Sequence, residues 1–178
     1  MGVIMLDDME NLKILSVFHK KSKPFGDVKS KSVSCFAVRV SGTMRYIFGD
    51  KEFVVNPGEM IFLKKGSCYK YKAETEEDSL VTIINLEGVY DDIEPNVYSV
   101  KDFYDIDYIM YHMADIWVFG NHSQRYQCLS ALYGLLSFVS AKYLQEYHIK
   151  TKVGIIDPAV SYLKNNIYNC DLQIRVNL

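Results

Sequence analysis

The order of apolar and polar positions divides the chain into a β-rich first part and a helical second part. Between Leu12 and Leu86, short runs of β-branched and aromatic residues are separated by turn residues about every eight positions. This rhythm is typical of an antiparallel sandwich or barrel and argues against parallel βαβ units. The expected strands are Val33–Val40, Thr43–Phe48, Glu52–Val55, Met60–Leu63, Ser67–Tyr71 and Leu80–Leu86.

After Tyr98 the apolar residues recur at three- and four-residue spacings, which predicts an amphipathic helix over most of Asp105–Val118. Ser123 is the expected N-cap of a longer helix that reaches about Tyr147. This second helix is apolar on more than one face, so we expect it to pack on the β-barrel and on a second copy of itself. A helix wholly buried within a monomer is the alternative. The expected dimer interface consists of Tyr126, Leu129, Tyr133, Leu136 and Tyr143.

A third helix is predicted to begin at Asp157–Pro158, because Asp is a favoured N-cap and Pro is favoured at the first helical position. The sequence therefore predicts three regions: a barrel over residues 1–96, a helical dimerisation region over 97–150, and a linker with one short helix over 151–178. The third region is too short to form a domain by itself. The expected fold class is mainly β with C-terminal helices, an α+β arrangement.

Composition excludes several classes of protein. Lys and Arg number 20 against 22 Asp and Glu, a net charge of −2, so the chain lacks the basic surplus of a self-sufficient nucleic-acid binder. The four cysteines form no C-x-x-C pair, which favours a reduced cytoplasmic protein without structural zinc. The N-terminus lacks a basic segment, and the longest uncharged run is shorter than the ~20 apolar residues of a membrane span, so neither export nor a membrane partner is expected.

The segment from Gly58 to Tyr71 resembles the second conserved motif of the cupin superfamily. Gly58 and Gly66 match its glycines, whereas Lys64 replaces the proline and Tyr69 replaces the metal-binding histidine. The resemblance places the ligands of the first cupin motif at Lys29, Lys31 and Cys35. Protonated Lys and neutral Tyr are poor metal ligands, so we expect no metal, no cofactor and no enzymatic activity, and a barrel that binds a ligand instead.

The whole order of parts resembles the AraC family of transcriptional regulators: a His-poor cupin barrel, two helices, a linker, and the segment Ile155–Tyr168. The resemblance implies that a small effector, often a sugar, binds in the barrel and that the following helices form a homodimer. It also implies sequence-specific DNA binding through helix-turn-helix units of a C-terminal domain, of which only the first helix lies within these residues. The chain is then expected to be the sensor half of a longer regulator.

The resemblance and strand alternation together suggest which side chains line the barrel. If Tyr69 points inward as the family histidine does, Tyr71 does too, because side chains alternate along a strand. The same parity, started at Cys35, places Arg39 and Ser41 inside. The expected ligand-binding set is Arg39, Ser41, Tyr69, Tyr71, Val81 and Ile83. Tyrosines with an Arg and a Ser suit a polyol or a small anion.

Other interpretations of the same residues remain open. The aromatic side chains could simply fill a small barrel, which would leave a pure dimerisation module. His19 and the lysines after it are interpreted as a solvated basic loop before Pro24. The alternative function is a freestanding, non-metal cupin that binds a small molecule.

Overall fold

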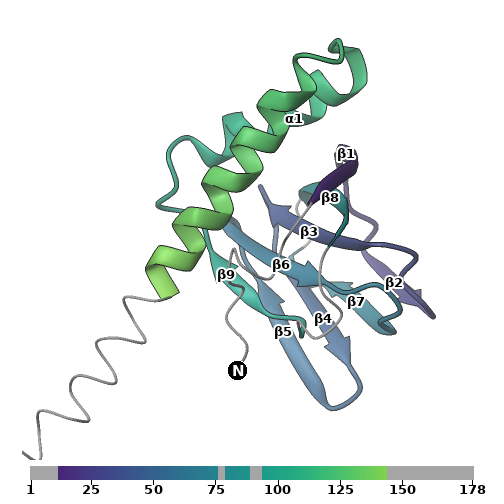
Figure 1. Cartoon of the computed structure of the whole chain (residues 1–178). Coiled ribbons are helices and arrows are strands. Elements are labelled where there is room, and N and C mark those ends of the chain that lie inside the picture. The colour runs from purple at the N-terminus through teal and green to yellow at the C-terminus, as the bar shows by residue number, and fades with distance from the viewer. Residues whose placement is uncertain (1–11, 76–78, 89–93, 144–178) are drawn as a thin grey trace, which may run out of the picture. The chain divides into compact units, whose positions relative to one another are not determined.

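The computed structural model describes residues 12–75, 79–88 and 94–143, and its β-strands form two antiparallel sheets (Figure 1). The five-stranded sheet has the order β1-β8-β3-β6-β9 and the four-stranded sheet the order β2-β7-β4-β5. The strands are β1 (Lys13–Lys21), β2 (Phe25–Val28), β3 (Ser34–Arg39), β4 (Met44–Phe48), β5 (Lys51–Val55), β6 (Glu59–Leu63), β7 (Tyr69–Ala73), β8 (Leu80–Glu87) and β9 (Val97–Ser99).

The six predicted strands are confirmed as β3 to β8, with ends that shift by one or two residues. The sequence did not single out the other three. β1 ends in basic residues, β2 is four residues long with no buried position, and β9 has three residues. The described strands form two facing sheets with separate strand orders, and no strand pairing among them closes the two sheets into one barrel.

The space between the sheets holds one of the two layers of the hydrophobic core. Cys35 and Ala37 of β3 pair with Leu63 and Ile61 of β6 in register, and they belong to one buried cluster with residues of the facing sheet. The neighbours Phe36 and Val38 are fully buried but lie outside this cluster. Because strand side chains alternate, β3 contributes to a core layer on each of its faces.

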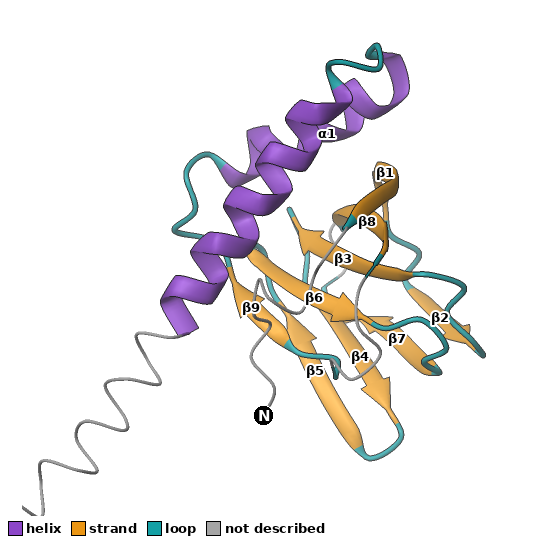
Figure 2. Ribbon diagram, viewed as in Figure 1, coloured by secondary structure: helices purple, strands orange, loops and turns teal. Residues whose placement is uncertain are grey.

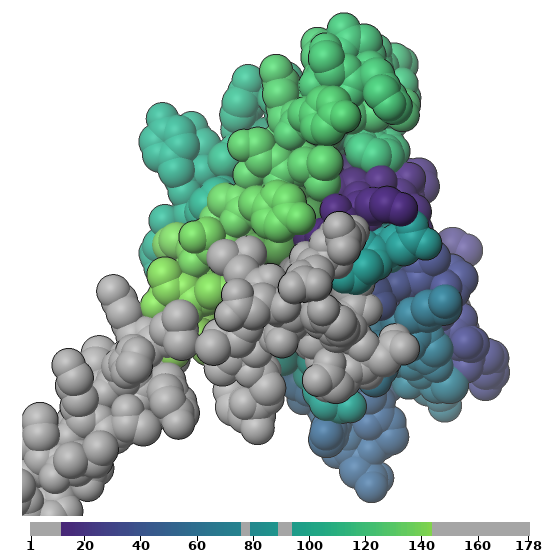
Figure 3. Space-filling view, viewed as in Figure 1, coloured from purple at the N-terminus to yellow at the C-terminus, as the bar shows by residue number. Residues whose placement is uncertain are grey.

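Two helices form the second layer, on the face of the five-stranded sheet that points away from the four-stranded sheet (Figure 2). The first is α1 (Ile106–Phe119), which confirms the predicted amphipathic helix, and it contacts β1 and β8. The second spans residues 125–143 of the described chain. Phe138 of the second helix packs against Phe103 in the turn before α1, with ring centroids 5.4 Å apart. The Cys128 thiol of the second helix donates to the backbone carbonyl of Met113 in α1 at 3.5 Å. Figure 3 shows this helical layer lying over the β-strands.

The second helix is capped at Asn121, not at the predicted Ser123. The backbone N–H of Gln124 donates to Asn121 Oδ1 at 3.0 Å, and the backbone N–H of Asn121 donates to Gln124 Oε1 at 2.8 Å. These reciprocal bonds form a capping box with Asn at the cap and Gln three residues later. Ser123 instead donates its hydroxyl to Asn121 Oδ1, so it supports the cap from inside the first turn.

The chain divides into two compact units, Met1–Ser140 and Ala141–Leu178. The expected linker and third helix over 151–178 lie outside the described residues. Neither helix of the described chain combines the length and the apolar character that a membrane crossing requires.

The two-layer core predicts a large difference between two phenylalanines. Phe36 is fully buried under the helices, whereas Phe25 is 74% exposed. Phe36→Ala should lower the free energy of unfolding by about 3–5 kcal/mol, the usual cost of truncating a buried Phe. Urea denaturation measures this change, and Phe25→Ala is the matched control, expected within about 0.5 kcal/mol of wild type. Equal losses for the two variants would contradict this assignment of the core.

Candidate ligand-binding site

A cavity of about 410 Å³ lies between the two sheets. Its floor and walls come from alternate residues of β3, β4, β7 and β8, which point into the inter-sheet space. Basic side chains from the end of β1 and the segment that follows complete the lining. The lining residues are Lys20, Lys21, Ser22, Lys23, Val28, Lys31, Cys35, Ala37, Arg39, Met44, Tyr46, Leu63, Tyr69, Tyr71, Val81 and Ile83.

Arg39, the last residue of β3, is the buried polar centre of this cavity, with 1% of its surface exposed. Its Nη1 donates to the hydroxyl oxygens of Ser22 and Ser79, each at 2.7 Å. Its Nη2 donates to the Tyr46 hydroxyl at 3.3 Å. All three acceptors are neutral, and the Arg39 Nε–H has no hydrogen-bond partner.

Among the described residues the hydrogen-bond partners of Arg39 are neutral, which makes burial of its charge unfavourable. A guanidinium remains protonated in proteins, so burial cannot be relieved by loss of its proton. Burying a charge without a counter-charge costs several kcal/mol, about the size of a small domain's whole stability. The three hydroxyl contacts offset part of that cost, and a bound anion would offset more.

Three lysines stand at the mouth of the cavity, and their position corrects a prediction. Residues 19–21 belong to β1 and pair with residues 80–82 of β8, so the interpretation of this segment as a solvated loop is wrong. Lys20 and Lys21 end the strand, and Lys23 follows it; all three are exposed and line the cavity. His19 lies on the opposite face of β1, where it hydrogen-bonds Thr82 and packs edge-on against Tyr111 of α1.

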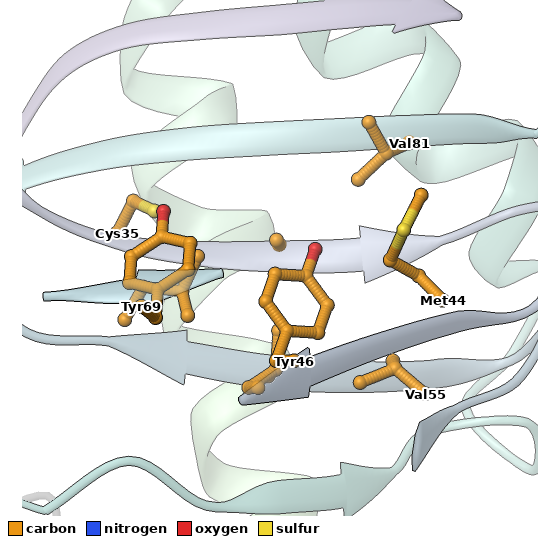
Figure 4. Close-up of a cluster of buried hydrophobic side chains, with 9 residues drawn as sticks. Cys35, Met44, Tyr46, Val55, Tyr69 and Val81 are labelled. Atoms are coloured by element: carbon orange, nitrogen blue, oxygen red, sulfur yellow. The ribbon is translucent and has the colours of Figure 1, made fainter. Parts of the chain in front are cut away.

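The far wall of the cavity is aromatic. The ring centroid of Tyr46 lies 5.8 Å from that of Tyr69 and 6.2 Å from that of Tyr71. Figure 4 shows the hydroxyls of Tyr46 and Tyr69 pointing from the four-stranded sheet toward the strands that carry Cys35 and Val81. Burial raises the pKa of both tyrosines above the ordinary value, so both stay neutral and act as hydrogen-bonding groups.

Cys35 of β3 and the nearby Lys31 both line the cavity. Burial raises the pKa of the Cys35 thiol to about 11, and the nearby Lys31 and Lys20 ammonium groups act in the opposite direction. At neutral pH the thiol is therefore protonated and unreactive. Lys29, the other position matched to a first-motif cupin ligand, lies outside the cavity, where its ammonium pairs with Asp27 at 2.8 Å.

Five of the six side chains predicted to bind a ligand line this one cavity: Arg39, Tyr69, Tyr71, Val81 and Ile83. Ser41 does not line it, and its hydroxyl accepts the backbone N–H of Leu80. The prediction missed Tyr46 and Met44, although the alternation of apolar residues along β4 points both into the core. It also missed the lysines of β1, because that strand was not recognised.

The predicted dimer residues fall into three groups by exposure. Tyr126 is 67% exposed and Tyr133 is 39% exposed, so both are available to a partner. Leu129 and Tyr143 are half-buried. Leu136 is 1% exposed and packs inside the monomer, so it cannot contact a second copy in this arrangement.

The fold is shared with proteins of known structure. The chain is similar to ToxT from Vibrio cholerae: an apo lysine-to-alanine variant aligns over 74% of this chain and 56% of ToxT, with 11% identity and a TM-score of 0.52. ToxT bound to (E)-4-(8-methylnaphthalen-1-yl)but-3-enoic acid aligns over 75% and 58%, with 12% identity and a TM-score of 0.50. The chain thus spans somewhat more than half of the length of ToxT. No protein-family model and no curated protein matches it. These likenesses define the class as a cupin-like fold with C-terminal helices.

The pKa of Cys35 predicts a selective thiol reaction. At pH 8 only about one Cys35 thiol in a thousand is ionised, because the pH lies three units below a pKa of about 11, and the side chain is buried. Iodoacetamide should therefore modify exposed Cys68 and spare Cys35 in the native protein. Peptide mass spectrometry measures both sites, and the same reaction in urea is the control in which both react. Equal native rates would show that Cys35 is not buried as described.

Proposed function

We propose that this chain is the effector-binding and dimerisation region of a transcription regulator similar to those of the AraC family. The observation that carries the proposal is the cavity between the two sheets, which gathers five of the side chains that the family resemblance assigns to the effector. The role proposed for the cavity is reversible binding of a small molecule, not catalysis. Its buried thiol and tyrosines are held neutral, and the described residues of the lining place no general base beside a nucleophile.

The likeness to ToxT supports the regulatory part of the proposal. ToxT is an AraC-family regulator, and the alignment covers 74% of this chain. One ToxT structure holds a small organic molecule, which supports a small-molecule effector for the same fold. Sequence-specific DNA binding is assigned to a C-terminal helix-turn-helix domain that continues from the region 151–178. A freestanding cupin-like binding protein would share the cavity and lack the response on DNA.

Dimerisation is assigned to the exposed stripe of the second helix. Tyr126 and Tyr133 lie seven residues apart, two helical turns, so they share one face with half-buried Leu129 between them. Leu136, which the sequence placed in the same stripe, instead anchors the helix to its own monomer. The proposed interface therefore lies nearer the N-terminal end of the helix than the original five residues suggest.

Filling the cavity should abolish effector binding. Ala37 is 3% exposed and lines the cavity from the centre of β3, so Ala37→Leu places three further carbon atoms in the space for the effector. A compound that raises the melting temperature of the wild type should have at least tenfold weaker affinity for the variant. Ser41→Ala is the control outside the cavity and should bind like wild type. Unchanged affinity of Ala37→Leu, measured by calorimetry, would move the effector elsewhere.

The regulatory role can be tested on DNA without knowing the natural operator. The chain is fused to a monomeric DNA-binding domain whose operator requires a dimer, and repression of a reporter is measured. We expect repression by the wild-type fusion and at least a fivefold loss for Tyr126→Glu, because a carboxylate would be buried at the interface. Tyr104→Glu, at an 83% exposed position before α1, is the matched control and should repress normally. Repression by all three fusions would refute dimerisation through this stripe.

A further inference from the structure

We infer that the effector is an organic acid whose carboxylate binds Arg39 and whose apolar body lies against the tyrosine wall of the cavity. This inference rests on the proposed function, because it names the chemical class of the molecule bound at the same site. It also replaces the sugar suggested by the family resemblance with an anion. Three features of the cavity support it: the unfilled donors of Arg39, the distribution of charge, and the aromatic lining.

Arg39 has donors available for an anion. A guanidinium carries five N–H groups, and the three hydrogen bonds of Arg39 go to Ser22, Ser79 and Tyr46. The Nε–H is buried without a partner. The three hydroxyls hold the guanidinium in place from three different segments of the chain, so its orientation is fixed before a ligand arrives. A carboxylate accepts two N–H bonds from one guanidinium, which matches the donors left over.

Among the described residues of the lining, every charged side chain is basic. Lys20, Lys21, Lys23 and Lys31 line the cavity together with Arg39, and no Asp or Glu is among the described residues that do so. The lysines are at the solvent side and Arg39 is buried, so the potential becomes favourable for an anion along the path inward. A neutral sugar could hydrogen-bond to these groups but would leave the buried guanidinium without a counter-charge.

The aromatic and aliphatic side chains of the lining indicate what kind of apolar body the effector has. Tyr69 and Tyr71 lie 6.5 Å apart by ring centroid, and both lie near Tyr46, so the three rings form one continuous wall. Met44, Val81 and Ile83 add aliphatic surface. A wall of this kind favours an aromatic or aliphatic body over a chain of hydroxyls. The combination selects an amphipathic monocarboxylate that fits in about 410 Å³.

The direct test compares acids with isosteric neutral molecules. Binding of 4-phenylbutyrate and octanoate is measured by calorimetry beside binding of their primary amides, with glucose and arabinose as the sugar arm. The amides keep the size and the apolar body but remove the charge. We expect each acid that binds to do so at least tenfold more tightly than its amide, with an affinity that falls as salt is raised.

Two arginine variants assign the effect to one residue. Arg39→Gln removes the buried charge. Arg45→Gln removes an arginine of β4, in the facing sheet, that is paired with Glu52 and Glu74 outside the cavity. Arg39→Gln should bring the acid and the amide to within threefold of each other, while Arg45→Gln keeps the wild-type preference. If Arg39→Gln fails to fold, the comparison of acid and amide binding in the wild-type protein still tests the organic-acid inference.

The outcomes separate this inference from the proposed function. Equal affinities for acids and amides, or binding of sugars alone, would overturn the organic-acid inference and leave a small-molecule sensor standing. A preference for acids that Arg39→Gln does not reduce would overturn the assignment to Arg39. Absence of binding by the acids overturns the inference, and if no compound of any class binds, the proposed sensor role fails with it.

Discussion

A permanently charged guanidinium held between two apolar sheets is the constraint around which this fold is arranged. Arg39 ends β3, and its hydrogen bonds reach Ser22 after β1, Ser79 before β8 and Tyr46 on β4 of the facing sheet. One side chain therefore ties the two sheets and two connecting segments to each other. The contacts go to hydroxyls and not to carboxylates, so the site keeps its positive charge while its geometry is fixed.

Much of this arrangement follows from the period-two alternation of strands and was predictable. The parity of β3 places Arg39 inward and Phe36 and Val38 on the opposite face of the strand, and the structure agrees. The same rule, applied to β7 and β8, brings Tyr69, Tyr71, Val81 and Ile83 to one cavity. Alternation works here because each of these strands is regular, with one face in each core layer.

The sequence predictions are wrong where a strand becomes irregular or where a helix is apolar on two faces. The backbone N–H groups of Val40 and Ser41 both donate to the Leu80 carbonyl, a β-bulge pattern that interrupts the alternation and removes Ser41 from the cavity. Leu136 failed for another reason: the second helix is apolar on two faces, and periodicity cannot tell which one meets its own sheet. β1 was missed because its last residues are basic, a composition usual for loops.

The backbone of β1 alone separates this edge of the cavity from the helical layer. Lys20 lines the cavity, while His19, the preceding residue, contacts Tyr111 of α1 and Thr82 of β8 on the other face. Adjacent residues of a strand are about 3.3 Å apart along its axis. A displacement of β1 at Lys20 would also move His19 and its contact with Tyr111, so this strand is an element through which a bound ligand could reach α1.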